Sequence, residues 1–198
     1  MIPADVRSLP MRGKFEAHIT VAGGGDLEPL CKQLGVDYVA IELASGVHAS
    51  QPMTASHHEG VIADVVDEVN ALAARIAAAG FVITRTKLEA EASSEGVPLG
   101  EHDGYFEFHV KVRVAGREAE LVAIAAAHGA RLSRNNRRAN EDGRFVTMRV
   151  YRLGRVAAEE KLAALLEALA GFAVVGIARE FTVYDSRVEL DAGWLEPT

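Results

Sequence analysis

The alternation of apolar and polar residues is clearest near the N-terminus, in the segment KFEAHITV. From Phe15 onwards every second residue is apolar, and the residues between them are Glu16, His18 and Thr20. A period of two is typical of a β-strand that buries one of its faces. We therefore predict a strand over residues 14–21 that turns its apolar face to a core and its three polar residues to the other side.

The same pattern returns 91 residues later, in the segment FEFHVKV. There Glu107 and His109 stand where the first segment has its glutamate and its histidine. A Gly-Phe pair follows each of two long helical patterns, at 80–81 and at 171–172, and these pairs are also 91 residues apart. Landmarks that recur at one offset indicate an internal duplication.

The hydrophobic periodicity between these landmarks predicts the element order βαββαβ twice. Predicted strands cover residues 14–21, 37–44, 53–57, 81–91, 105–114, 130–135, 144–153 and 172–190, and predicted helices cover 26–34, 61–80, 117–129 and 156–171. This order is that of the ferredoxin-like motif, in which helices cover one face of an antiparallel sheet. The predicted fold class is α+β, with tandem ferredoxin-like repeats at 14–91 and 105–191, joined by a Gly-, Ser- and Pro-rich linker at 92–104 into one compact unit.

Charge and composition narrow the classes of partner. The chain has 21 basic and 28 acidic residues and a net charge of −7, which argues against a partner such as double-stranded nucleic acid. No apolar run approaches the roughly 18 residues of a membrane span, and the N-terminal residues lack the apolar core of a signal peptide. The single cysteine, Cys31, allows no internal disulfide. We therefore expect a cytoplasmic protein without a membrane partner.

Strand alternation places ionisable residues of both signs on the face that the helices leave uncovered, and we expect this face to be open. Imidazoles are the commonest general acids and bases near neutral pH, so His18 and His109 are the predicted catalytic residues. Lysine and arginine side chains neutralise phosphate or carboxylate groups. The predicted substrate-binding residues are Glu16, Thr20, Arg85, Lys87, Glu107, Lys111, Arg149 and Tyr151.

The segment HITV, which begins at His18, resembles the His-x-Thr-hydrophobic motif of the 2H phosphoesterase superfamily. The resemblance implies two related halves, each giving one such motif to a central cleft. It implies that one histidine acts as base and the other as acid on a phosphodiester, while hydroxyl groups hold the phosphate without a metal. The second motif, HVKV, departs from the family pattern because Lys111 stands where the family has threonine or serine.

The expected function is hydrolysis of a phosphoester on a small anionic substrate, by His18 and His109 in a polar cleft between the repeats and without a cofactor. One alternative is a non-catalytic ligand-binding or assembly module, possible as a homodimer, since ferredoxin-like sheets often associate through faces or edges. A second alternative is a metal-dependent enzyme that uses histidines and carboxylates. Its possible ligands are His48, His57 and His58 together with His18 or Glu42, although His57 and His58 would point to opposite sides of a strand.

Overall fold

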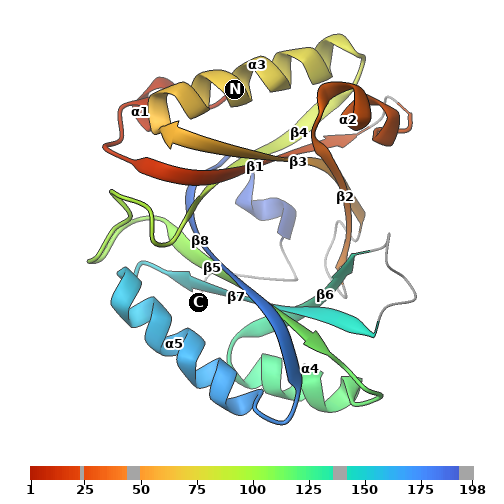
Figure 1. Cartoon of the computed structure of the whole chain (residues 1–198), viewed down its shortest axis with the longest axis vertical. Coiled ribbons are helices and arrows are strands. Elements are labelled where there is room, and N and C mark those ends of the chain that lie inside the picture. Colours follow the sequence, from red (N-terminus) through yellow and green to blue (C-terminus); the bar gives the residue numbers. More distant parts are fainter. Residues whose placement is uncertain (23–24, 44–49, 136–141, 192–198) are drawn as a thin grey trace. The chain divides into compact units, whose positions relative to one another are not determined.

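The computed structural model describes residues 1–22, 25–43, 50–135 and 142–191. Its helices and antiparallel strand pairs make the fold α+β, as the sequence predicts. The described chain divides into two compact units (Figure 1). Unit 1 holds the described residues 1–22, 25–40, 51–97 and 181–188, and unit 2 holds 41–43, 50, 98–135, 142–180 and 189–191.

Unit 1 combines helices with antiparallel strands in the spatial order β2-β3-β1-β4. Its elements are α1 (Ala4–Arg7), β1 (Arg12–Ala22), α2 (Glu28–Leu34), β2 (Asp37–Leu43), β3 (Ser50–Val61), α3 (Ile62–Ala78) and β4 (Val82–Glu91). Residues 41–43 of β2 are assigned to unit 2, where they pair with a strand of that unit. The last part of the final strand, β8 (Ala173–Asp185), belongs to unit 1 from Phe181 onwards.

The core of unit 1 lies where α3 packs against β1 and β4. In β1 the predicted alternation is confirmed, because the apolar residues from Phe15 to Val21 are buried. Helix α3 buries residues at a spacing of three and four along one side: Ile62, Val65, Val66, Val69, Leu72, Ala73 and Ile76. The helix stops before Gly80, whose φ of +90° is a left-handed conformation that glycine adopts without steric cost.

Unit 2 repeats the element order β-α-β-β-α-β, with the spatial strand order β6-β7-β5-β8. Its elements are β5 (Tyr105–Arg113), α4 (Glu118–Ala127), β6 (Ala130–Asn135), β7 (Gly143–Tyr151), α5 (Arg155–Ala168) and the first part of β8. Helix α5 packs against β5 and β7, and α4 packs against β6. Phe106 and Phe108 are fully buried on the helix side of β5, which confirms the predicted inward face.

Two segments differ from their predicted structure. Residues 53–57 are part of a strand more than twice as long, Ser50–Val61, which pairs with β1 from Met53 to Val61. Its run of polar residues resembles a loop, but the hydrogen-bonded partner strand decides the structure. The final strand ends at Asp185 instead of continuing to 190, because the Asp185 carboxylate accepts the backbone N–H of Arg187 and turns the chain. The 3₁₀ helix η2 (Val188–Asp191) follows.

Candidate functional site

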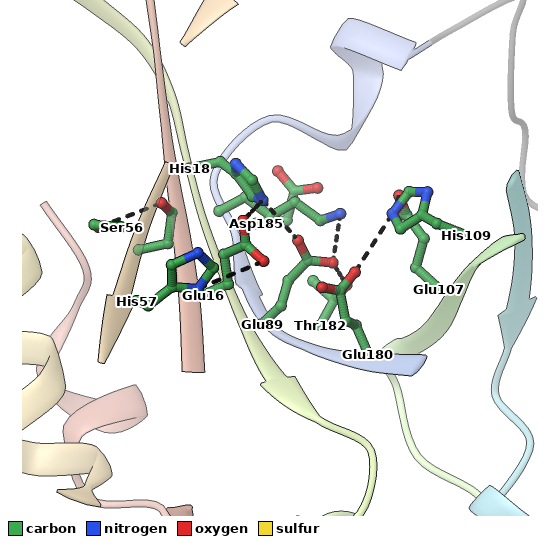
Figure 2. A network of polar contacts seen from close by, with 12 residues as sticks. Glu16, His18, Ser56, His57, Glu89, Glu107, His109, Glu180, Thr182 and Asp185 are labelled. Carbon is green, nitrogen blue, oxygen red and sulfur yellow. Dashed lines mark hydrogen bonds and ion pairs between the residues drawn. The ribbon is translucent and has the colours of Figure 1, made fainter. Parts of the chain in front are cut away.

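Each unit holds a histidine flanked by two glutamates (Figure 2). In unit 1, Nε2 of His18 lies 3.4 Å from Oε1 of Glu16 and 3.6 Å from Oε2 of Glu89. Glu16 and His18 share a face of β1 because they are two residues apart, and Glu89 stands directly opposite Glu16 on β4. We call these three residues the His18 group.

The His18 group continues at both ends into further polar contacts. Oε2 of Glu16 lies 3.9 Å from Nδ1 of His57, which stands opposite Glu16 on β3. Oε1 of Glu89 lies 2.7 Å from Nζ of Lys87. Side-chain exposure falls steadily along this row, from 70% for His57 to 27% for Glu16, 20% for His18 and 1% for Glu89. The row therefore runs from an exposed side chain to a buried one.

Positive side chains and a hydroxyl adjoin His18 on the same pair of strands. In the β1–β4 register Lys87 stands opposite His18, and Arg85 stands opposite Thr20. Arg85 donates from Nε and Nη2 to both carboxylate oxygens of Asp185, at 2.8 and 2.5 Å. Burial alone would raise the pKa of Asp185, but the hydrogen bonds and the charge of Arg85 outweigh burial and lower this pKa.

Unit 2 contains the counterpart of the His18 group at an offset of 91 residues in all three members. Nε2 of His109 lies 3.2 Å from Oε1 of Glu107 and 3.4 Å from Oε2 of Glu180. We call these three residues the His109 group. Nδ1 of His109 lies 2.9 Å from the hydroxyl oxygen of Thr147, which stands opposite His109 on β7. Both ring nitrogens of His109 therefore have protein partners.

The two carboxylates of the His109 group change its protonation. Burial alone would lower the pKa of His109, but the hydrogen bonds and the negative charges of Glu107 and Glu180 outweigh burial and raise the pKa to about 10. At neutral pH the ring therefore carries a proton on each nitrogen. In this state Nδ1–H donates to the Thr147 hydroxyl and Nε2–H points to the carboxylates.

A buried arginine extends the His109 group at the place that His57 takes in unit 1. Arg149 stands opposite Glu107 and donates from Nε to Oε2 of that residue at 2.5 Å. Its Nη2 donates to Oδ2 of Asp191 at 2.6 Å, and its guanidinium carbon lies 4.7 Å from the ring centroid of Tyr105. Burial would lower the pKa of Arg149, but the negative charges around it, that of Glu107 first, outweigh burial and raise this pKa well above its usual range.

The remaining predicted site residues lie beside these groups. Thr20 is buried two residues beyond His18 on the same face of β1. Lys111 is half-buried, with Nζ 5.9 Å from the ring centroid of Phe145. Tyr151 packs its ring 5.1 Å from that of Tyr105. Unit 1 thus brings together Glu16, His18, Thr20, Arg85 and Lys87, and unit 2 brings together Glu107, His109 and Arg149 with Tyr151 and Lys111 on the neighbouring positions.

The expectation that this polar face is open to solvent is wrong for its central residues. Arg85, Lys87, Glu89, Glu107 and Arg149 all have nearly complete burial of the side chain. Each of these charges lies within ion-pair distance of an opposite charge. This pairing compensates part of the cost of removing the charges from water, which is why alternation alone misjudges their exposure.

Several residues that complete the two groups are absent from the predicted site. Glu89 and Glu180 flank the histidines, and their offset of 91 residues equals that of the histidines, so the sequence contained a signal for them. Asp185, Asp191 and Thr147 had no such signal. Asp185 lies inside the predicted strand 172–190 and Asp191 directly after it, and only the fold places them beside Arg85 and Arg149.

The structure also bears on the metal hypothesis. His57 lies on the side of Glu16, whereas His58 contacts Ser56 and Glu68, as expected for neighbours on a strand. In the described ranges of the chain, no cluster of three or more histidine, cysteine, aspartate or glutamate side chains could hold a metal ion. His48 and the side chain of Glu42 lie outside the described residues.

Sequence comparisons with protein families and with curated proteins gave no match to this chain. Among the helices that the structure describes, none combines the length and the apolar character needed to cross a membrane.

Proposed function

We propose that this protein is an acid–base enzyme for a small phosphorylated substrate, and that the reacting phosphoester binds at the His18 group. The observation that carries this proposal is the register of β1 and β4, which sets His18 and Thr20 directly opposite Lys87 and Arg85. Neighbouring positions on β1 and β4 therefore combine an imidazole, a hydroxyl and two cations. These are the groups that hold a phosphoryl group and move a proton during its hydrolysis.

Each of these groups has a chemical role in the proposed reaction. The imidazole of His18 exchanges a proton with the attacking water or the leaving oxygen. The hydroxyl of Thr20 and the ammonium of Lys87 donate to phosphoryl oxygens, where negative charge accumulates. Glu16 and Glu89 orient the imidazole and stabilise its protonated form. Lys87 and Arg85 balance two of the nearby carboxylates, Glu89 and Asp185, and so reduce the repulsion that a phosphate anion meets at the His18 group.

The resemblance of the segment HITV to 2H phosphoesterases supports the same reaction. We also propose that the fold consists of two ferredoxin-like repeats that arose by duplication. The strand orders β2-β3-β1-β4 and β6-β7-β5-β8 support this description, as does the packing of α3 on β1 and of α5 on the corresponding strand β5. The offset of 91 residues, which extends to Glu89 and Glu180, supports it independently.

The test is a screen of cyclic phosphodiesters and phosphomonoesters with the wild type and the His18→Gln variant. Removal of an acid–base imidazole is expected to lower kcat by about 10²- to 10⁴-fold. His58→Gln is the matched control, because His58 lies next on β3 to His57 and faces Ser56 and Glu68. Equal turnover by wild type and His18→Gln, or no turnover of any phosphoester by the folded wild type, would remove the proposal.

A second candidate function, non-catalytic ligand binding by unit 2, is favoured by a separate observation. Nη1 of Arg149 and the hydroxyl of Tyr151 are buried without a hydrogen-bond partner among the described residues. Both residues share a face of β7 because they are two positions apart. A buried donor without a partner costs roughly 1–3 kcal/mol, and a carboxylate or carbonyl ligand would remove that cost.

Tyr151→Phe separates a ligand-binding role from a structural one. If the hydroxyl serves a ligand, the variant binds small carboxylates more weakly than the wild type in calorimetric titrations, while its free energy of unfolding stays equal or rises. The rise follows because phenylalanine removes a buried polar atom that lacks a partner. Equal affinity of both proteins for every carboxylate tested would eliminate this candidate.

A further inference from the structure

We propose that His57 exchanges protons between solvent and His18, with the Glu16 carboxylate as the carrier between the two imidazoles. The inference rests on the proposed acid–base role of His18 and adds a residue that supplies its proton. His57 is a positioning residue in this scheme, since it acts through Glu16 and does not touch the reacting group.

The two oxygens of Glu16 face different histidines. Oε2 lies 3.9 Å from Nδ1 of His57, and Oε1 lies 3.4 Å from Nε2 of His18 (Figure 2). A carboxylate held in this way can accept a proton from one imidazole and release it to the other. The separation of 3.9 Å closes by rotation of the exposed His57 side chain or through one bridging water.

Exposure gives the row a direction. The His57 side chain is 70% exposed and therefore in contact with water, whereas His18 is 20% exposed and Glu89 is 1% exposed. In unit 2 the residue opposite the first glutamate is Arg149, which is buried and keeps its proton at every physiological pH. Because arginine does not release its proton, Arg149 cannot take the part in unit 2 that His57 takes in unit 1.

The charged and polar groups that face the path come from four strands. They are His57 on β3, Glu16 on β1, Glu89 and Lys87 on β4, and the Thr182 hydroxyl on β8, which donates to Oε1 of Glu89 at 3.5 Å. In the transfer, protonated His57 gives its Nδ1 proton to Oε2 of Glu16. A half-turn of the neutral carboxyl group carries that proton to Nε2 of His18. His57 then takes a proton from water or buffer, so charge and atoms balance.

The experiment is a nuclear magnetic resonance measurement of proton exchange between the His18 ring and water, in full-length protein labelled with ¹⁵N-histidine. His57→Gln retains hydrogen-bonding capacity but cannot titrate, and it is expected to slow exchange at His18 at least about tenfold. Added free imidazole is expected to restore the rate. The chemical shifts of His18 should stay at their wild-type values, because the contacts of His18 with Glu16 and Glu89 remain.

His58→Gln is the control, and its exchange rate at His18 is expected to equal that of the wild type. The proposal is overturned if His57→Gln exchanges as fast as the wild type, or if imidazole fails to accelerate a slowed variant, which would indicate a structural effect. The measurement needs no substrate. A protein that hydrolyses no phosphoester can therefore still show the relay, and an active enzyme without the relay contradicts this inference alone.

Discussion

The His18 group and the His109 group share their sequence spacing and differ in what surrounds them. Both place a histidine against two glutamates, and in both the second strand adds a residue opposite the first glutamate. In unit 1 that residue is the exposed His57. In unit 2 it is the buried Arg149, which also holds Asp191. The position opposite the first glutamate therefore holds an exposed side chain in unit 1 and a buried one in unit 2.

A second difference lies opposite each histidine. Thr147 meets Nδ1 of His109 from β7, whereas the residue opposite His18 on β3 is Ala55, which has no polar side-chain atom. In unit 2 a row of ion pairs joins residues of alternating charge, in the order Glu180, His109, Glu107, Arg149 and Asp191. The comparison teaches that the same spacing of histidine and glutamates can stand in two different polar surroundings, one with an exposed imidazole and one with a buried guanidinium.

The largest expected effect is on the free energy of unfolding, when each of the two residues that distinguish the groups is replaced by methionine. Arg149→Met removes the cation that neutralises Glu107 and Asp191. Because both carboxylates are buried and lose this partner, the free energy of unfolding is expected to fall by about 3–5 kcal/mol. His57→Met is the matched variant at an exposed position, with an expected change below about 0.5 kcal/mol. Urea unfolding measures both, and similar costs for the two variants would contradict the comparison.

The next effect concerns the pH dependence of stability in unit 2. The raised pKa of His109 means that the folded state binds its proton more tightly than the unfolded chain does. This stabilisation is fully present below about pH 6.5, the usual pKa of histidine, and it is lost as the pH rises towards about 10. On the order of 2–4 kcal/mol should disappear across this window.

Unfolding free energies of the wild type and His109→Gln, measured at several pH values across that window, isolate the effect. The difference between the two proteins should shrink steadily as the pH rises, because glutamine does not titrate. A difference that stays constant with pH would show that the His109 proton is bound equally in the folded and unfolded states.

The parts of the fold that depend on local periodicity could be predicted from the sequence. Alternation in β1 and β5 identified the buried face, and the spacing of apolar residues identified α3 with its end near Gly80. The length of β3 could not be predicted in this way, because its polar residues carry no strand signal and its pairing with β1 is a long-range contact.

The candidate site was predicted only in part for a similar reason. The histidines and their first glutamates stood out because they recur at one offset, and each acquires its partners within its own unit. Burial of Lys87 and Arg149 was not predictable from alternation, because it depends on the carboxylates that neutralise them, Glu89 on the same strand as Lys87 and Glu107 on the strand beside Arg149. The sequence pattern assigns a side chain to one face of a strand, whereas the charges of its partners determine whether a charged side chain on that face can be buried.

The smallest effect tests the Thr147 hydroxyl, which lies 2.9 Å from Nδ1 of His109. Thr147→Val keeps the shape of the side chain but leaves the Nδ1–H of His109 without its acceptor, so the free energy of unfolding should fall by about 1–2 kcal/mol. Loss of an acceptor for the charged ring should also lower the pKa of His109, which a magnetic resonance titration of the ring can follow. A pKa that stays at its wild-type value in Thr147→Val would mean that Glu107 and Glu180 alone determine the protonation of His109. The contrast between Thr147 and Ala55 would then have no part in the different surroundings of the two histidines, and the carboxylates with Arg149 would account for the state of unit 2.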